Sequence, residues 1–274
     1  MSHFLYGANV QANGIRQHYL RYGGVGQGRS DKDAVIIVPG ITSPAITWGF
    51  VGERFGRYFD TYILDVRGRG LSEASDQLNY GVDAQASDVI AVAHALGLKH
   101  YAIVGHSMGA RIGARAAASH PSGLQRLVMV DPPVSGPARR AYPADLSWYL
   151  DSIALARKGC KAEAMRAYCP SWTTDQLQLR AEWLHTCDER AVIKSFEDFH
   201  TEDVHADFEQ LRIPTLLIAA ERGDVIRESE LMEIKTLIPQ VRSCRVRDAG
   251  HMIPWDNELG FYAAFESFLG VALC

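Results

Sequence analysis

Short apolar segments alternate with longer segments of helical pattern along much of the chain after residue 34. The apolar segments, which we expect as strands, lie at 34–38, 61–64, 102–104, 127–130, 216–219 and 242–246. Helical patterns between the first four of them cover 51–58, 84–96 and 108–119. Apolar strands separated by helices are typical of βαβ units, in which helices bury both faces of a mainly parallel sheet. The alternation therefore predicts an α/β fold with right-handed crossovers.

A hairpin is predicted before this alternation begins. Extended segments at 5–10 and 15–22 flank Asn13-Gly14, a pair that supplies the positive φ angles of a tight turn. The glycine-rich segment at 23–28 superficially resembles a nucleotide-binding loop. Polar residues and a strand follow it instead of a helix, so we interpret it as a flexible connection.

The alternation stops between about residue 132 and residue 206. This segment has a helical pattern, is rich in Trp, Tyr, Arg and His, and begins with several prolines. Strand character returns at Ile213-Pro214. We therefore expect a single domain whose core comprises residues 1–132 and 206–274, with a helical cap inserted at 133–205.

Composition is that of a protein with one large core. Hydrophobic residues make up 47% of the 274 residues, and 28 Lys and Arg against 32 Asp and Glu leave a net charge of −4. We therefore expect no nucleic-acid partner. No apolar run approaches the roughly 20 residues that span a bilayer, and we see no secretion signal. The charge balance and the lack of such a run lead us to expect no membrane partner. Five widely spaced cysteines are typical of reduced thiols, so we expect a cytoplasmic protein. The oligomeric state is left open.

Gly105-His106-Ser107-Met108-Gly109 connects a predicted strand to a predicted helix. A G-x-S-x-G pattern in this context places its serine in a strained turn with the hydroxyl above the sheet. The flanking glycines let neighbouring backbone approach closely. We therefore predict that Ser107 is a nucleophile and that the side chain of His106 points elsewhere.

A base and an oxyanion hole are predicted near this serine. His251 follows the last predicted strand, from which its side chain can reach Ser107. Pro39-Gly40-Ile41 follows the strand at 34–38, and the backbone N–H groups of Ile41 and Met108 would hold an oxyanion. The charged residues at 65–72 are expected to brace these loops without a catalytic role.

Two positions compete for the carboxylate that would orient His251. Asp131 ends the strand after that of the nucleophile, and Pro132-Pro133 stiffens the turn beyond it. Asp224 lies after the first strand beyond the cap, in the segment 220–224. In that segment Gly223 occupies the place of the acid in a G-E-x-D pattern, and Asp224 falls one residue late.

No metal site is expected. His200 and His205 enclose Glu202 and Asp203, but their spacing matches no helical ligand pair and no other Cys or His partner is near in the sequence. We interpret this segment as a solvated acidic loop.

The sequence resembles the α/β-hydrolase family over nearly its whole length. The matching elements, in order, are the hairpin, the Pro-Gly loop, D-x-R-G-x-G-x-S at 65–72, G-H-S-M-G and the late Gly-His. Segments 40–50, 58–72, 130–143, 179–187 and 249–256 are similar to a narrower group, the deformylases of bacterial nicotinate degradation. The resemblance implies a hydrolase without metal or organic cofactor that cleaves a small linear amide and releases formate. It also implies the triad Ser107, Asp131 and His251, and so favours Asp131 over Asp224.

Catalytic residues alone leave the substrate open. The same residues would serve an esterase, an enol-lactonase or a carbon–carbon bond hydrolase that acts on another small ring-cleavage acid. A small-molecule receptor on this fold is the alternative that is not an enzyme, because it would keep the triad and turn over slowly.

The cap is expected to bind the carboxylate of the substrate. A small anion under a cap needs cationic or hydrogen-bonding partners. The candidates are Arg111, which follows the nucleophile, and Arg180, His185 and Thr186 in the cap, with Trp183 as an apolar wall. Arg139 and Arg140 are less attractive, because consecutive residues rarely both face a pocket.

Overall fold

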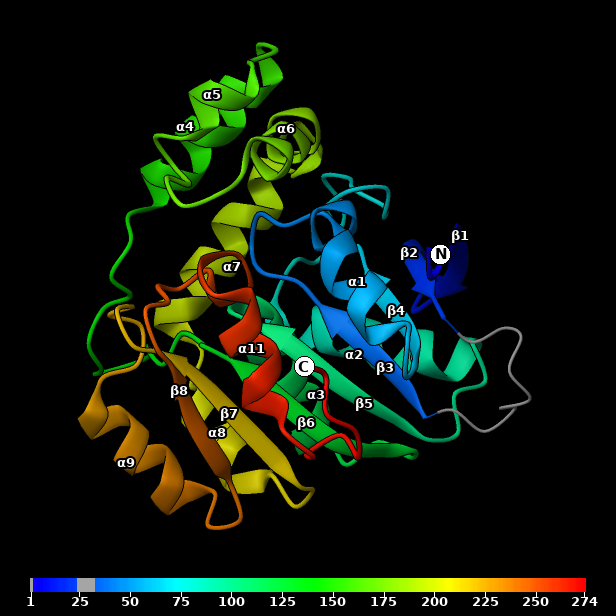
Figure 1. Ribbon diagram of the computed structural model, residues 1–274, viewed down its shortest axis with the longest axis vertical. Coiled ribbons are helices and arrows are strands. Elements are labelled where there is room, and N and C mark those ends of the chain that lie inside the picture. Colours follow the sequence, from blue (N-terminus) through cyan, green and yellow to red (C-terminus); the bar gives the residue numbers. More distant parts are fainter. Residues whose placement is uncertain (1, 24–32) are drawn as a thin grey trace.

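An eight-stranded sheet forms the centre of the molecule, with the strand order β1-β2-β4-β3-β5-β6-β7-β8 (Figure 1). The computed structural model describes residues 2–23 and 33–274, so residues 24–28 of the glycine-rich segment lie outside the described residues. Pairs β1–β2 and β2–β4 are antiparallel, and the pairs from β4 to β8 are parallel. The predicted α/β class with a mainly parallel sheet is confirmed.

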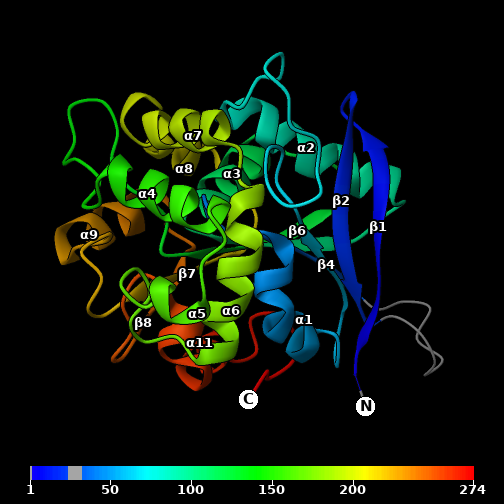
Figure 2. The same ribbon diagram turned by 90° about the horizontal axis from the view of Figure 1, so that it is seen from above.

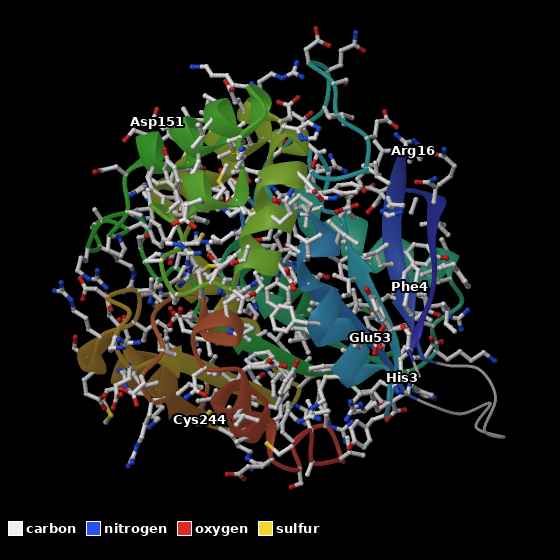
Figure 3. All side chains as sticks on the ribbon, turned by 45° about the horizontal axis from the view of Figure 1, so that its top comes forward. His3, Phe4, Arg16, Glu53, Asp151 and Cys244 are labelled. Carbon is white, nitrogen blue, oxygen red and sulfur yellow. The ribbon has the colours of Figure 1, made fainter. Side chains whose placement is uncertain are left out.

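The N-terminal hairpin consists of β1 (Phe4–Ala12) and β2 (Ile15–Tyr22). Its turn residues Asn13 and Gly14 have φ angles of 52° and 76°, as the sequence predicts. The start of β1 is held against the first helix, because Glu53 accepts the N–H groups of His3 at 2.7 Å and Phe4 at 3.2 Å (Figure 3). The hairpin therefore forms the antiparallel edge of the sheet.

Six further strands carry the apolar segments. They are β3 (Ala34–Val38), β4 (Asp60–Leu64), β5 (Tyr101–His106), β6 (Leu124–Val130), β7 (Thr215–Ala220) and β8 (Arg242–Val246). Every residue of β3, β5 and β7 is buried, as expected for central strands covered on both faces. Strand β8 lies at the edge of the sheet and is more exposed.

Helices cover both faces of the sheet. Helices α1 (Gly49–Phe55) and α11 (Glu258–Phe265) lie on one face, and α2 (Val82–Ala95) and α3 (Met108–Ala118) lie on the other (Figures 1 and 2). The helix expected at 51–58 instead starts with a 3₁₀ turn, η1 (Ala45–Trp48), and α1 ends at Phe55. The early start follows Pro44, whose missing N–H costs nothing at a helix N-terminus. The remaining elements of the core are α9 (Glu228–Leu237) and α10 (Ile253–Asp256).

The chain between β6 and β7 is helical. It contains α4 (Leu146–Arg157), α5 (Ala162–Met165), α6 (Thr174–Trp183), η2 (Leu184–Thr186), α7 (Glu189–Thr201) and α8 (Val204–Gln210). Helices α4, α5 and α6 lie together at one end of the molecule, above the carboxyl ends of the parallel strands (Figures 1 and 2). Helix α8 instead packs against α3. In residues 2–23 and 33–274, no helix is both long and apolar enough to cross a bilayer.

Candidate active site

Ser107 occupies a strained turn between β5 and α3. Its φ of 54° is positive, which is rare for a residue with a side chain. The turn needs its two glycines, because a Cβ atom at Gly109 would lie 1.9 Å from the carbonyl oxygen of Val38, and one at Gly105 would lie 2.2 Å from that of Gly109. Close backbone packing therefore holds the Ser107 hydroxyl at the floor of a cavity.

His251 lies in the loop after β8 and joins Ser107 to Asp131. Its Nε2 atom is 2.9 Å from Oγ of Ser107, and its Nδ1 atom is 2.7 Å from Oδ2 of Asp131. The other carboxylate oxygen of Asp131 accepts the N–H of Ala220 at 3.1 Å. Asp131 is fully buried, and each oxygen of its carboxylate has a hydrogen-bond partner. This geometry lets Ser107 donate its proton to Nε2 while Nδ1–H donates to Asp131.

Asp224 has a different environment. Its carboxylate is exposed and binds the guanidinium of Arg227 at 2.7 Å, with Arg140 at 3.5 Å. A Cβ atom built on Gly223 would lie 3.4 Å from Oδ2 of Asp131. The carboxylate of Asp131 thus lies where a side chain at position 223 would point. The structure brings Asp131, and not Asp224, to His251.

The loop after β3 carries Ile41 above Ser107. Ile41 is buried and lines the cavity, and Met108 is the first residue of α3. In the described residues, neither backbone N–H donates to a protein acceptor. Arg69 fixes the loop, because its Nε–H donates to the carbonyl oxygen of Ile41 at 3.1 Å and its other N–H groups bind Ser195 of α7 and nearby carbonyl groups. A residue of the 65–72 segment therefore braces the loop, as expected.

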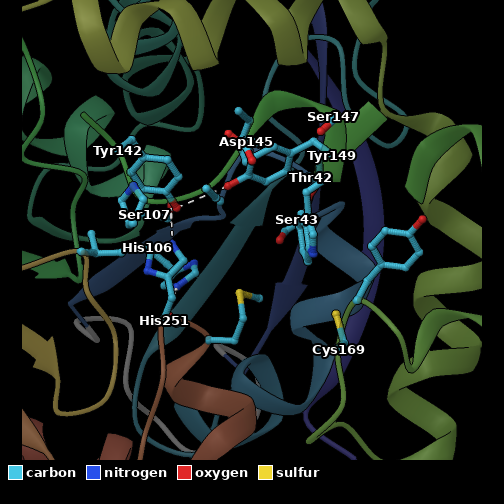
Figure 4. Close-up of a pocket in the computed structure, with 18 of the residues that line it drawn as sticks. Thr42, Ser43, His106, Ser107, Tyr142, Asp145, Ser147, Tyr149, Cys169 and His251 are labelled. Atoms are coloured by element: carbon cyan, nitrogen blue, oxygen red, sulfur yellow. Dashed lines mark hydrogen bonds between the residues drawn. The ribbon is translucent and has the colours of Figure 1, made fainter. Parts of the chain in front are cut away.

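A cavity of about 700 Å³ lies over Ser107 and His251 (Figure 4). Its floor comes from the core and its walls come from the loop before α4, from α4 and from α6. Aromatic side chains line much of the wall, namely Tyr142, Trp148, Tyr149 and Tyr168. None of these four residues was predicted from the sequence, although the segment 132–206 is rich in Trp and Tyr.

Arg180 is the one arginine or lysine among the described residues that line this cavity. It is buried, and its guanidinium lies 5.6 Å and 5.7 Å from the ring centres of Trp148 and Trp172. Its hydrogen bonds to Thr42 are long, at 3.4 Å and 3.5 Å, and in the described residues its Nε–H has no partner. The cation thus lies over two aromatic rings, and no carboxylate in the described part of the chain forms an ion pair with it.

The other four substrate-binding candidates are not among the described residues that line the cavity. Arg111 donates its hydrogen bonds to the carbonyl oxygens of Pro133, Ser135, Asp198 and Glu202, which fastens α3 to the end of α7. Trp183 ends α6, Thr186 donates to its carbonyl oxygen at 2.6 Å, and His185 is exposed. The buried face of α6 contains Leu177, Arg180 and Ala181, and so turns only Arg180 toward the cavity.

His106 lines the cavity beside Ser107, and its ring is bonded to the loop that carries His251. Its Nε2 atom is 2.9 Å from the carbonyl oxygen of His251, so the ring supports the loop that carries His251. Burial, reinforced by the neighbouring His251, lowers the pKa of His106 to about 3, and a hydrogen bond to the His251 backbone opposes this only partly. His106 therefore stays neutral over the ordinary pH range.

The segment from His200 to His205 is not the solvated loop that the sequence indicated. Helix α7 extends to Thr201 and α8 begins at Val204, so only a short link separates two helices. His205 is buried against the ring of Phe208. Across the described part of the chain, no group of three or more His, Cys, Asp or Glu side chains could hold a metal ion.

Comparison with known proteins gives consistent matches. A family model described as the alpha/beta hydrolase fold matches residues 33–258. N-formylmaleamate deformylase from Pseudomonas putida strain KT2440 is 58% identical over 269 residues, covering 98% of both chains. The crystal structure of N-formylmaleamic acid deformylase from Pseudomonas putida S16 has a TM-score of 0.90 and 51% identity, and covers 95% of this chain and 100% of that chain.

A more distant solved structure shares the fold alone. E-2-(acetamidomethylene)succinate hydrolase has a TM-score of 0.78 and 21% identity, and covers 98% of this chain and 100% of that chain. The matches to the two Pseudomonas proteins include the cap, because both run over almost the whole chain.

Proposed function

Because the chain belongs to the α/β-hydrolase family, we propose that it is an amide hydrolase that converts N-formylmaleamate into maleamate and formate. The observation that carries the proposal is the series of hydrogen bonds from Ser107 through His251 to Asp131. Ser107 and His251 line a cavity that also contains a buried arginine. The deformylase that is 58% identical over nearly the whole chain indicates the substrate.

Ser107 starts the reaction by attacking the formyl carbon. Its proton passes to Nε2 of His251 as the bond from Oγ to carbon forms. Asp131 holds the ring and stabilises its charged form. The N–H groups of Ile41 and Met108 are assigned to the oxyanion, a role supported by their having no acceptor among the residues that the structure describes.

Departure of the nitrogen completes the first half of the reaction. The bond between the formyl carbon and nitrogen breaks, and His251 returns the proton to the nitrogen of maleamate. This nitrogen lies between two carbonyl groups in the substrate, so the charge that it gains is delocalised. An esterase-like site can therefore cleave this amide more easily than an amide of a simple amine.

Water completes the second half. His251 removes a proton from water, the hydroxide oxygen bonds to the formyl carbon, and the ester bond to Ser107 breaks. Formic acid leaves and releases its remaining proton to water to become formate, and the proton on His251 returns to Ser107. Each step uses residues of this chain and water, and the enzyme ends in its starting state.

Arg180 is assigned to the substrate carboxylate. A buried carboxylate needs a charged or hydrogen-bonding partner, and Arg180 is the arginine that the described cavity lining supplies. Stacking on Trp148 and Trp172 orients its guanidinium while leaving Nε–H available. This contact would place the anionic end of the substrate away from Ser107 and select small acids.

A formate-release assay tests the function. Purified protein is incubated with N-formylmaleamate and, separately, with p-nitrophenyl acetate, and Ser107→Ala serves as the control. We expect many turnovers of N-formylmaleamate, with formate and maleamate in equal amounts, and loss of both in the variant. Hydrolysis of the ester without formate release would instead identify an esterase, and less than one turnover of either substrate would indicate a receptor.

We place the enzyme in the cytoplasm. All five cysteines lie in the described part of the chain and are free thiols, as is usual in a reducing compartment.

A further inference from the structure

Tyr142 is a residue of the cavity that the mechanism above does not use. It lies in the loop between β6 and α4, and its ring is 6.2 Å from that of His251 in an edge-to-face arrangement. Figure 4 shows its hydroxyl directed toward Ser107 and His251. Tyr142 is only 7% exposed, so a buried phenol lies directly beside the two groups that move the proton.

Its neighbours hold Tyr142 in this position. The hydroxyl of Tyr149 on α4 is hydrogen-bonded to that of Tyr142 at 3.3 Å, and the ring of Tyr142 packs against Phe199 of α7 at 5.0 Å. Its backbone N–H donates to Nε2 of His200 at 3.4 Å. Either hydroxyl can donate in this pair, and when Tyr149 is the donor the proton of Tyr142 is available for an acceptor in the cavity.

Tyr142 remains protonated during the reaction. Burial holds the pKa of its phenol well above the usual range, and the neighbouring Tyr149 and Asp131 act in the same direction. The hydroxyl of Ser107 is close enough to oppose this effect in part. The phenol is therefore a fixed hydrogen-bond donor beside the reacting atoms, and not a general base.

We propose that Tyr142 is a further catalytic residue, whose hydroxyl donates a hydrogen bond to the carbonyl oxygen of the departing maleamate amide. The inference rests on the proposed function. As the bond from the formyl carbon to nitrogen breaks, the electron pair of that bond spreads from nitrogen to this carbonyl oxygen. A donor there stabilises the leaving group while His251 protonates the nitrogen, and Tyr142 keeps its own proton throughout.

Two formyl donors with different leaving groups isolate this role. N-formylmaleamate and p-nitrophenyl formate both give the same formyl ester on Ser107, so deacylation is identical and only acylation differs. p-Nitrophenolate stabilises its own charge and has no amide carbonyl group. We expect Tyr142→Phe to lower kcat/KM for N-formylmaleamate by about tenfold or more, the effect of one lost hydrogen bond in the transition state. Its kcat/KM for p-nitrophenyl formate should change by less than about twofold on the same grounds.

A matched control is Tyr101→Phe, which removes a buried phenol from the start of β5, far from the cavity. This variant should leave kcat/KM unchanged for both substrates. If Tyr142→Phe fails to fold, Tyr149→Phe removes the partner of Tyr142 and should produce a smaller loss, again confined to the amide.

The outcomes separate this inference from the proposed function. Equal losses on both substrates in the folded Tyr142→Phe enzyme, or no loss on either, would overturn the role of Tyr142 alone. A wild-type enzyme that hydrolyses p-nitrophenyl formate but releases no formate from N-formylmaleamate would overturn the proposed function and this inference with it.

Discussion

His251 Nδ1 and Asp131 Oδ2 lie 2.7 Å apart, although 120 residues separate them along the chain. Asp131 follows β6 and His251 follows β8, and β7 lies between these two strands in the sheet. The carboxylate therefore reaches past the end of β7, where the N–H of Ala220 binds its second oxygen. Strand β7 therefore holds the carboxylate of Asp131 in place, although the acidic residue itself comes from the end of β6.

Replacement of the acid should reduce the rate far more than the stability. We expect Asp131→Ala to lower kcat by about 10⁴-fold, because His251 loses the partner that orients it and stabilises its charge. The measurement is formate release at saturating N-formylmaleamate. Asp224→Ala is the matched control, since it removes an exposed carboxylate that pairs with Arg227. It should keep nearly full activity. An inactive Asp224→Ala beside an active Asp131→Ala would show that the acid lies after the cap.

Replacement of the nucleophile should abolish turnover in a folded protein. Ser107→Ala removes one oxygen from a turn whose shape is held by Gly105 and Gly109, so the fold should persist. We expect kcat to fall by roughly 10⁴- to 10⁶-fold, because the members of a triad act as a unit. Formate release measures the loss, and thermal unfolding by circular dichroism checks the fold. A folded variant that keeps a tenth of the wild-type rate would contradict covalent catalysis by Ser107.

Replacement of Arg180 should change substrate preference. Arg180→Met keeps much of the bulk between Trp148 and Trp172 but removes the charge. We expect KM for N-formylmaleamate to rise by about tenfold or more, as for a lost charge-assisted hydrogen bond. KM for the uncharged p-nitrophenyl acetate should stay within about threefold of wild type by the same argument. Similar rises for both substrates would show that Arg180 shapes the cavity and does not bind the carboxylate.

Replacement of Arg111 should act on stability instead. Its guanidinium is buried and satisfies four backbone carbonyl groups from two segments. Arg111→Met would remove the side-chain donors from these carbonyl groups, of which that of Asp198 keeps only the N–H of Glu202, so we expect the free energy of unfolding to fall by about 2–4 kcal/mol. Urea unfolding measures this change. A variant as stable as wild type, but with a raised KM for N-formylmaleamate only, would return Arg111 to the list of carboxylate anchors.

The sequence predicts the core of the site because local patterns determine it. The strand, turn and helix around Ser107 follow from apolar runs and two glycines, and His251 follows from its place after the last strand. The choice between Asp131 and Asp224 depends instead on which carboxylate the folded loops direct toward His251. A side chain at Gly223 would point at the carboxylate of Asp131, so two loops converge on one point that neither segment reveals alone.

The cap was less predictable, because the rotation of each helix decides which residues face the cavity. Trp183 and Arg180 are one turn apart on α6, yet only Arg180 lines the cavity. For Arg111 the chemistry of the residue was equally suited to a ligand and to backbone carbonyl groups. Arg111 binds carbonyl groups of α7 and of the loop after β6, which the fold brings beside it. No periodicity in the sequence indicates that these segments meet there.

His106 links the stability of the fold to pH. Its ring is 1% exposed, and burial is the main cause that lowers its pKa from 6.5 to about 3. The rings of His251 and Trp48 lie 5.0 Å and 5.4 Å away, and its Nε2–H donates to the carbonyl oxygen of His251. Protonation of Nδ1 would therefore place a charge in an apolar site beside a second histidine.

Acid should destabilise the protein through this group. Below about pH 6.5 the unfolded chain takes up a proton on His106 that the folded protein refuses until about pH 3, so the folded state loses stability as the pH falls through that window. One such proton contributes about 1.4 kcal/mol per pH unit to the slope. His106→Gln keeps an N–H donor for His251 but does not titrate. Urea unfolding between pH 7 and pH 5 should show a shallower decline for this variant than for wild type, by about one proton. Parallel declines for the two proteins would show that His106 is protonated in the folded state and that burial does not hold it neutral.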